Sequence, residues 1–164
     1  MLSVYSSKEL SDNKFAKMYE ILINNLFKTY PEYLAEKNKH DNKDNYNNLF
    51  NSIKTAEQYN VICFEEADLL IGYLSYSVIN DELWISEIQI REEYQGRGVL
   101  RNLIGKFVSM PEFKNYGCVK IHINRRNVHS QKVFCYMGFE KIGESTIYKI
   151  DTDNLINWNQ KNIY

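Results

Sequence analysis

The residues whose types and spacing most clearly suit ligand binding form a glycine-rich turn near the middle of the 164-residue chain. The turn, Gln95-Gly96-Arg97-Gly98, follows an apolar strand-like segment that ends at Ile90. It precedes a segment whose apolar residues recur at helical spacing. The first turn of a helix has backbone N–H groups without intrahelical partners, and the helix dipole adds partial positive charge there. The pattern therefore predicts an anion site suited to a pyrophosphate.

Side chains at the rim of this turn add to the expected site. Arg97 and Arg101 bring positive charge, and the two glycines let the backbone approach a ligand without an intervening Cβ. A glycine turn before a helix can also be only a tight connection. The residues expected to bind the anion are Gln95, Gly96, Arg97, Gly98, Val99, Leu100 and Arg101.

A second motif follows about thirty residues downstream, with Asn127, Ser130 and the pair Gly138-Phe139 in order. Together with Gln95 and Gly98, it resembles the pattern of the GNAT superfamily of acyl-CoA-dependent N-acetyltransferases. The resemblance covers about residues 61–150. It implies an α/β (α+β) fold in which a twisted, mostly antiparallel mixed sheet is flanked by helices on both faces. It also implies acetyl-CoA as acyl donor and direct attack by a primary amine in a ternary complex, without a covalent enzyme intermediate.

Two residues depart from the family pattern. Leu100 stands where the family usually has Gly or Ala. Phe134 stands where the family commonly has a Tyr thought to protonate the leaving thiolate, and a phenyl ring has no proton to give. Two functions therefore stay open. One is an N-acetyltransferase that acts on a small-molecule or peptide amine, and the other is a non-catalytic acyl-CoA-binding sensor or subunit.

The strand before the glycine turn changes its apolar phase. Leu83 and Ile85 are apolar at odd positions, whereas Ile88 and Ile90 are apolar at even positions. A β-bulge near Ser86-Glu87 would produce this slip, and so would a strand buried on both faces. By the family resemblance, the bulge would splay the strand from its neighbour, so that the pantetheine arm could pair with the exposed edge.

The same strand carries the predicted catalytic groups. An unpaired N–H near Ile88 would bind the thioester carbonyl and then the oxyanion, and the main chain of Gln89 and Ile90 would also contact the cofactor. Glu87 is the expected general base, which would take a proton from the incoming ammonium through a water. The alternative for Glu87 is a carboxylate in a salt bridge at the edge of the sheet.

The second motif is expected to border the cofactor. Asn127 stands at the start of a predicted helix, where it would act as N-cap, and the resemblance adds a contact with the cofactor. Phe134 lies two turns later on the same face. Tyr136 points well away from that face. Arg125 and Arg126 could reach the adenosine 3′-phosphate or could be solvated surface charges.

Composition narrows the function classes. The chain has 20 Lys and Arg against 21 Asp and Glu, which argues against binding of nucleic acid through bulk charge. Cys63, Cys118 and Cys135 are far apart in apolar surroundings, so we expect reduced core thiols and neither a disulfide nor a metal site. The sequence has no apolar run that could span a bilayer and no leader, which predicts a cytoplasmic protein that does not bind membranes.

Periodicity predicts the remaining elements of one domain over residues 1–164. Asn38–Asn48 is expected to be an exposed loop because it is dense in Asn, Asp and Lys. The tail from Asp151 to Tyr164 is expected either to dock on the domain or to pair with a second copy as a homodimer. The predicted strands are 2–5, 61–64, 69–78, 83–90, 118–123 and one or two within 140–150, and the predicted helices are 15–27, 49–56, 98–110 and 127–137.

Overall fold

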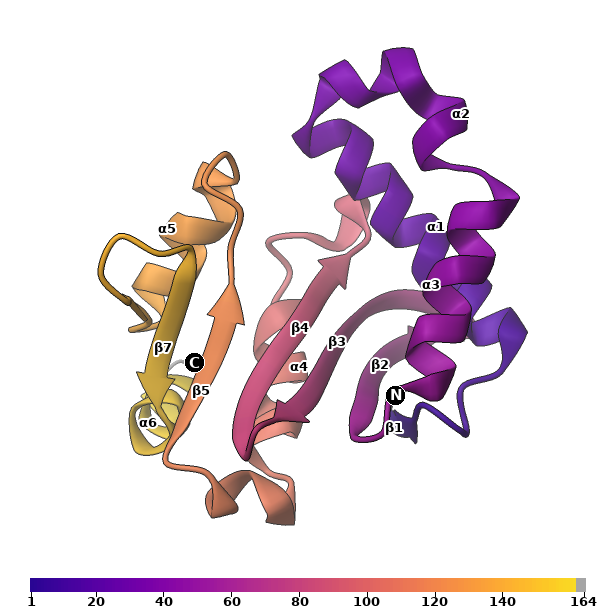
Figure 1. Ribbon diagram of the computed structural model, residues 1–164. Helices are drawn as coiled ribbons and strands as arrows, with labels where there is room; N and C mark the ends of the chain where they lie inside the picture. Colours follow the sequence, from indigo (N-terminus) through magenta and orange to yellow (C-terminus); the bar gives the residue numbers. More distant parts are fainter. Residues whose placement is uncertain (162–164) are drawn as a thin grey trace.

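A twisted mixed sheet forms the centre of the computed structural model, which describes residues 1–161 (Figure 1). Within these residues the sheet has seven strands in the order β1-β2-β3-β4-β5-β7-β6. The β4–β5 pair is parallel and the other pairs are antiparallel. The strands are β1 (Leu2–Ser6), β2 (Tyr59–Glu66), β3 (Leu69–Ile79), β4 (Glu82–Ile90), β5 (Cys118–His122), β6 (Glu140–Lys141) and β7 (Ile147–Asp151).

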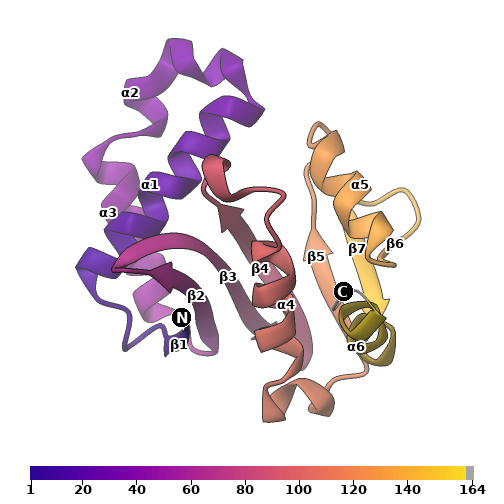
Figure 2. The same ribbon diagram turned by 180° about the vertical axis from the view of Figure 1, so that it is seen from behind.

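Helices cover both faces of the sheet, as the views from the two sides show (Figures 1 and 2). On one face lie α1 (Asp12–Thr29), α2 (Lys37–His40) and α3 (Lys43–Thr55), and on the other lie α4 (Val99–Val108), α5 (Val128–Tyr136) and α6 (Thr152–Lys161). Short 3-10 helices are η1 (Pro31–Glu36), η2 (Glu92–Tyr94) and η3 (Pro111–Asn115). The predicted fold class is confirmed.

Each face of the sheet has its own apolar core. The run Val61-Ile62-Cys63 in β2 is fully buried because its side chains alternate between the two cores. The first core joins α1 and α3 to the sheet through Phe15, Met18, Ile53, Val61, Cys63 and Tyr73. The second joins α4, α5 and α6 to it through Ile62, Leu74, Ile85, Leu103, Phe107, Phe134 and Leu155.

The prediction of a loop over Asn38–Asn48 was wrong. The segment holds α2 and the first half of α3, which begins at Lys43. Asn42 is the N-cap of α3, because its side chain accepts a hydrogen bond from the Asn45 N–H at 2.8 Å. The polar residues that resemble a loop in composition lie on the exposed side of this helix, while Tyr46 already packs against Phe15 of the core, with ring centres 5.0 Å apart.

The C-terminal segment docks on its own chain. Thr152–Lys161 forms α6, and Leu155 is fully buried in the core beneath α4. Helices α4 and α6 pack closely. A Cβ added to Gly105 of α4 would lie only 3.3 Å from Asn159 Nδ2 of α6. Residues 162–164 of the predicted tail lie outside the described residues.

The cysteine prediction was only partly right. All three thiols are free, but Cys135 is exposed on α5 and Cys118 is partly buried, so only Cys63 is a true core thiol. Helix α5 buries mainly Phe134, so Cys135 lies on its outer side. Within residues 1–161, no helix combines the length and the apolar character that crossing a membrane requires.

Candidate active site

Strands β4 and β5 diverge, and this opens an edge of the sheet (Figure 1). Their parallel pairing covers Leu83–Ile85 against Val119–Ile121. Beyond it β4 continues to Ile90, and among the described strands none pairs with Glu87–Ile90 on the β5 side. The main chain of this stretch is therefore available to a ligand that adds to the sheet edge.

The predicted β-bulge is present. Ile85 faces Tyr76 and Glu87 faces Ser75, so Ser86 is the extra residue. As a result, Leu83 and Ile85 before the bulge and Ile88 and Ile90 after it all contact the core beneath α4. The bulge, and not burial on both faces, explains the phase slip in the sequence.

The direction of the backbone groups after the bulge follows from one hydrogen bond. The Arg91 N–H donates to the Ile71 carbonyl at 2.8 Å, so residues 91, 89 and 87 turn their peptide groups toward β3. Ile88 and Ile90 consequently turn theirs toward the diverging edge. The Ile90 carbonyl already accepts hydrogen bonds from Asn25 Nδ2 and Gln95 Nε2, each at 3.1 Å. The N–H groups of Ile88 and Ile90 thus both face the gap, and so does the Ile88 carbonyl.

Both glycines of the turn adopt left-handed backbone conformations. Gly96 has φ +74° and Gly98 has φ +81°, and a Cβ added at either would meet no atom of the chain within 4 Å. Glycine is therefore required here by backbone conformation and not by crowding from the chain itself. Gly98 is the N-cap of α4 and offers no side chain to satisfy the first N–H groups of the helix. The turn presents open backbone donors, which is the geometry of an anion site.

The other residues predicted to bind the anion at this turn differ in their exposure to solvent. Arg97 is exposed and its guanidinium lies 5.8 Å from the centre of the Tyr94 ring. Val99 is buried in the core, so it can offer a ligand only its main chain. Leu100 is partly buried against the same core. Arg101, the third residue of α4, is also partly buried.

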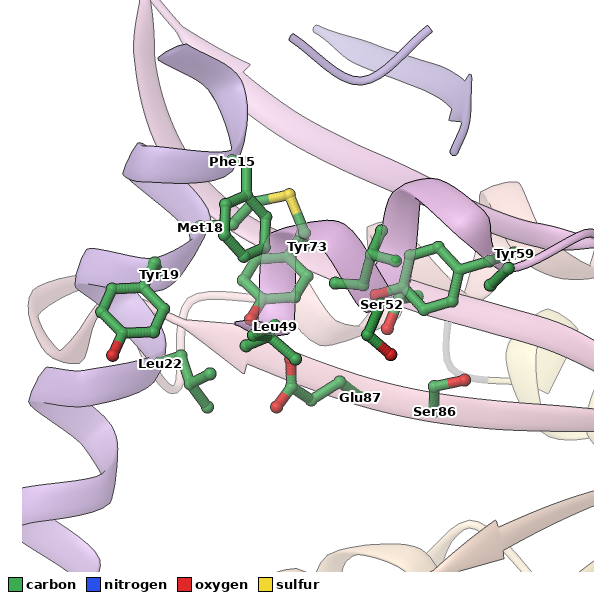
Figure 3. A pocket seen from close by; sticks show the side chains of 13 residues that line it. Phe15, Met18, Tyr19, Leu22, Leu49, Ser52, Tyr59, Tyr73, Ser86 and Glu87 are labelled. Atoms are coloured by element: carbon green, nitrogen blue, oxygen red, sulfur yellow. Dashed lines mark hydrogen bonds between the residues drawn. The ribbon is translucent and has the colours of Figure 1, made fainter. Parts of the chain in front are cut away.

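Glu87 projects to the other face of the sheet, into a pocket of about 290 Å³ beneath α1 and α3 (Figure 3). The Tyr73 hydroxyl donates a hydrogen bond to Glu87 Oε2 at 2.7 Å. Removal from water raises the pKa of Glu87, and the hydrogen bonds from Tyr73 and Gln89 oppose that rise. Among residues 1–161 no salt bridge involves Glu87. Glu87 is therefore a partly buried, hydrogen-bonded carboxyl group and, among the described residues, not the expected edge ion pair.

The sequence did not reveal several residues around these groups. Tyr73 and Tyr59 lie beside the pocket, and burial raises the pKa of both hydroxyls. Asn25 of α1 donates to Gln89 Oε1 at 2.8 Å and so ties the helix to the end of β4. A register model of the β3–β4 hairpin that included the bulge would have placed Tyr73 near Glu87. No local signal marks Asn25.

The second motif lies at the start of α5. The Asn127 side chain accepts a hydrogen bond from the Ser130 N–H at 3.0 Å, which confirms the predicted N-cap. Phe134 is 6% exposed and packs edge-on against Phe139, with ring centres 5.1 Å apart. Its contact with a cofactor stays a prediction. Tyr136 is exposed and points away, as expected.

The two arginines before this helix are engaged by the chain itself. Arg126 forms an ion pair with Glu32 of η1, and its guanidinium lies 5.2 Å from the centre of the Tyr30 ring. Arg125 donates to the Glu144 carbonyl at 3.2 Å. The contact of Arg126 links the loop after β5 to η1, next to the diverging strands.

Comparison with known proteins agrees with this architecture. Residues 28–149 match the family model of the acetyltransferase (GNAT) domain, and the chain belongs to this family. No curated protein sequence matches it. Among solved structures, it is similar to the PaiA N-acetyltransferase of Thermoplasma acidophilum in complex with coenzyme A, with a TM-score of 0.69 and 14% identity over 92% of this chain and 99% of that one.

Two further structures show the range of proteins that share this fold. The spermidine N-acetyltransferase of Vibrio cholerae, in complex with coenzyme A and spermine, has a TM-score of 0.65 and 17% identity over 95% of this chain and 98% of that one. The ribosomal-protein-S18-alanine N-acetyltransferase of Escherichia coli has a TM-score of 0.62 and 14% identity over 93% of this chain and 94% of that one. At such identities the likeness establishes the fold and leaves the acceptor open.

Proposed function

We propose that this protein transfers an acetyl group from acetyl-CoA to a primary amine by direct attack in a ternary complex. The observation that supports this most is the open edge of β4, where the Ile88 N–H faces a gap and Glu87 lies next to it in sequence. The same strand leads into the uncapped start of α4. One continuous segment thus combines a carbonyl-polarising donor, a carboxyl group and an anion site.

In this proposal the main chain of the turn, from Gln95 to Arg101, holds the pyrophosphate of acetyl-CoA. The edge of β4 at Gln89 and Ile90 holds the pantetheine arm, and the Ile88 N–H polarises the thioester carbonyl. Glu87 accepts the proton of the incoming ammonium through a water, so that a neutral amine attacks. Asn127 and Phe134 border the cofactor from α5. Water supplies the proton to the departing thiolate because Phe134 cannot.

A second candidate function rests on Phe134. Its ring is buried against Phe139 and carries no hydroxyl, so the site lacks the acid that the family commonly uses. A protein that binds acyl-CoA and does not turn it over, as a sensor or subunit, would fit that loss. The two candidates differ in whether any amine accepts the acetyl group.

Release of free thiol from acetyl-CoA in the presence of a broad amine panel tests the proposal. We expect turnover with at least one amine, and a Glu87→Gln variant with kcat lowered by roughly 10²–10⁴-fold and nearly unchanged affinity for acetyl-CoA. Thiol release no faster than hydrolysis with every amine would favour the sensor. An active Glu87→Gln variant would exclude Glu87 as the base.

The thermal stability of Glu87→Gln provides the folding control. The native pKa of Glu87 lies above its ordinary value of 4.5, so the native state binds this proton more tightly than the unfolded state does. Ionisation of Glu87 therefore lowers stability as pH rises above that value. We expect the variant to melt no lower than the wild type at neutral pH, and any advantage to shrink as the pH falls.

A further inference from the structure

The pocket beneath α1 and α3 is polar on the side of the sheet and mostly apolar on the side of the helices (Figure 3). Glu87 is the one charged residue among those that line it within the described part of the chain, and it lies at the sheet side. The hydroxyls of Tyr59, Tyr73, Ser75 and Ser86 belong to the same side. The helices contribute mainly carbon: Phe15, Met18, Tyr19, Leu22, Leu49 and Ile53.

The tyrosines of the pocket add aromatic rings to its lining, and two of their hydroxyls have partners in the chain. The Tyr19 hydroxyl donates to the His40 carbonyl at 3.2 Å, outside the pocket lining. The Tyr73 hydroxyl is engaged by Glu87. Aromatic rings that surround a cavity of this kind attract a cation through their faces and an apolar body through dispersion and the hydrophobic effect.

We propose that this pocket selects the acceptor, and that the acceptor is a small primary amine with one positive charge and an apolar, ring-sized body. The inference rests on the proposed function, because it assigns the substrate class of that site. One carboxylate matches one ammonium group. A second ammonium, as in a polyamine, or the further ammonium groups of an aminoglycoside would lose hydration and meet no second carboxylate among the described lining residues.

The size of the pocket agrees with this class. A protein cavity of about 150 Å³ lined by apolar side chains is large enough for benzene. The pocket here, of about 290 Å³, therefore has room for a ring with a short alkyl chain. Such an amine would place its nitrogen at Glu87, one residue from the Ile88 N–H that faces the gap.

A comparison of 2-phenylethylamine with spermidine, kanamycin and an alanine-terminated peptide tests the inference. We expect kcat/KM for 2-phenylethylamine, measured by thiol release, to exceed that of the others by tenfold or more. Replacement of the partly buried Leu49 by Glu should lower kcat/KM for 2-phenylethylamine at least tenfold and shift the preference toward spermidine. The control Leu34→Glu, at a residue that is 55% exposed on η1, should change neither value.

The failures of the two proposals can be told apart. Turnover that is fastest with spermidine, kanamycin or the peptide would overturn the substrate class while the acetyltransferase function stands. If no amine causes release of thiol from acetyl-CoA, the proposed function is overturned. Calorimetry of 2-phenylethylamine in the presence of coenzyme A then tests whether the pocket binds this class of amine. Binding that Leu49→Glu weakens and Leu34→Glu preserves would support the pocket. An absence of binding would overturn it.

Discussion

At the scale of single residues, the proposed mechanism depends on Glu87 and on its hydrogen bond from Tyr73. The sequence singled out Glu87 because it lies at the phase slip of its strand. It could not supply Tyr73, because the pairing depends on a register that the bulge at Ser86 resets. The location of the carboxyl group in a pocket between the sheet and two helices likewise depends on packing between distant segments. Residue types and local spacing do not predict that packing.

We predict that Tyr73→Phe shifts the pH dependence of turnover. The hydrogen bond from Tyr73 lowers the pKa of Glu87 against the larger effect of burial, so its loss raises that pKa further. The base must be ionised, and the acid limb of the kcat/KM profile therefore moves to higher pH. Tyr59→Phe is the matched control, since the hydrogen bonds that lower the pKa of Glu87 come from Tyr73 and Gln89 and not from Tyr59. An unmoved limb in Tyr73→Phe, or an equal shift in the control, would contradict this role.

At the scale of elements, the strand, turn and helix from β4 to α4 were accessible to sequence analysis. Alternation located the bulge, and glycine spacing located the turn. The length over which β4 and β5 pair was not accessible from the chain alone, because it depends on where two distant strands diverge. The helix over residues 43–48 was missed because of its local composition and not because of distant contacts. Apart from Tyr46, its first residues are polar and exposed, so composition conflicted with the capping signal at Asn42.

The turn gives the prediction that belongs to this scale. Gly98→Ala should weaken coenzyme A binding at least tenfold in calorimetry, because the added Cβ meets no atom of the chain and would occupy space that the proposal gives to the ligand. The left-handed conformation alone costs a non-glycine residue about 1–2 kcal/mol. Gly143→Ala is the control for that strain, since Gly143 has φ +56° and equally open surroundings. A folded Gly98→Ala protein that binds coenzyme A with the affinity of the wild type would contradict binding of the pyrophosphate at this turn.

At the scale of the whole molecule, the sheet separates two tasks. The proposed amine pocket lies on the face beneath α1 and α3, and the proposed anion site lies at the start of α4, which covers the other face. They meet at the diverging edge of β4. Helix α1 is fastened to this region by Asn25 and by ion pairs of Glu20 with Arg91 and of Lys28 with Glu92. The sequence predicts the anion site through its motifs, whereas the N-terminal third carries none, and its part in the proposed amine pocket follows from packing.

Titration of the intact protein with acetyl-CoA tests the central claim most directly. Calorimetry should show saturable binding at one site per chain. A concentration of 100 times the Kd should add about 2.7 kcal/mol to the free energy of unfolding and raise Tm by roughly 5–10 °C. A protein that gives no heat of binding and no shift in Tm at saturating acetyl-CoA would contradict the account.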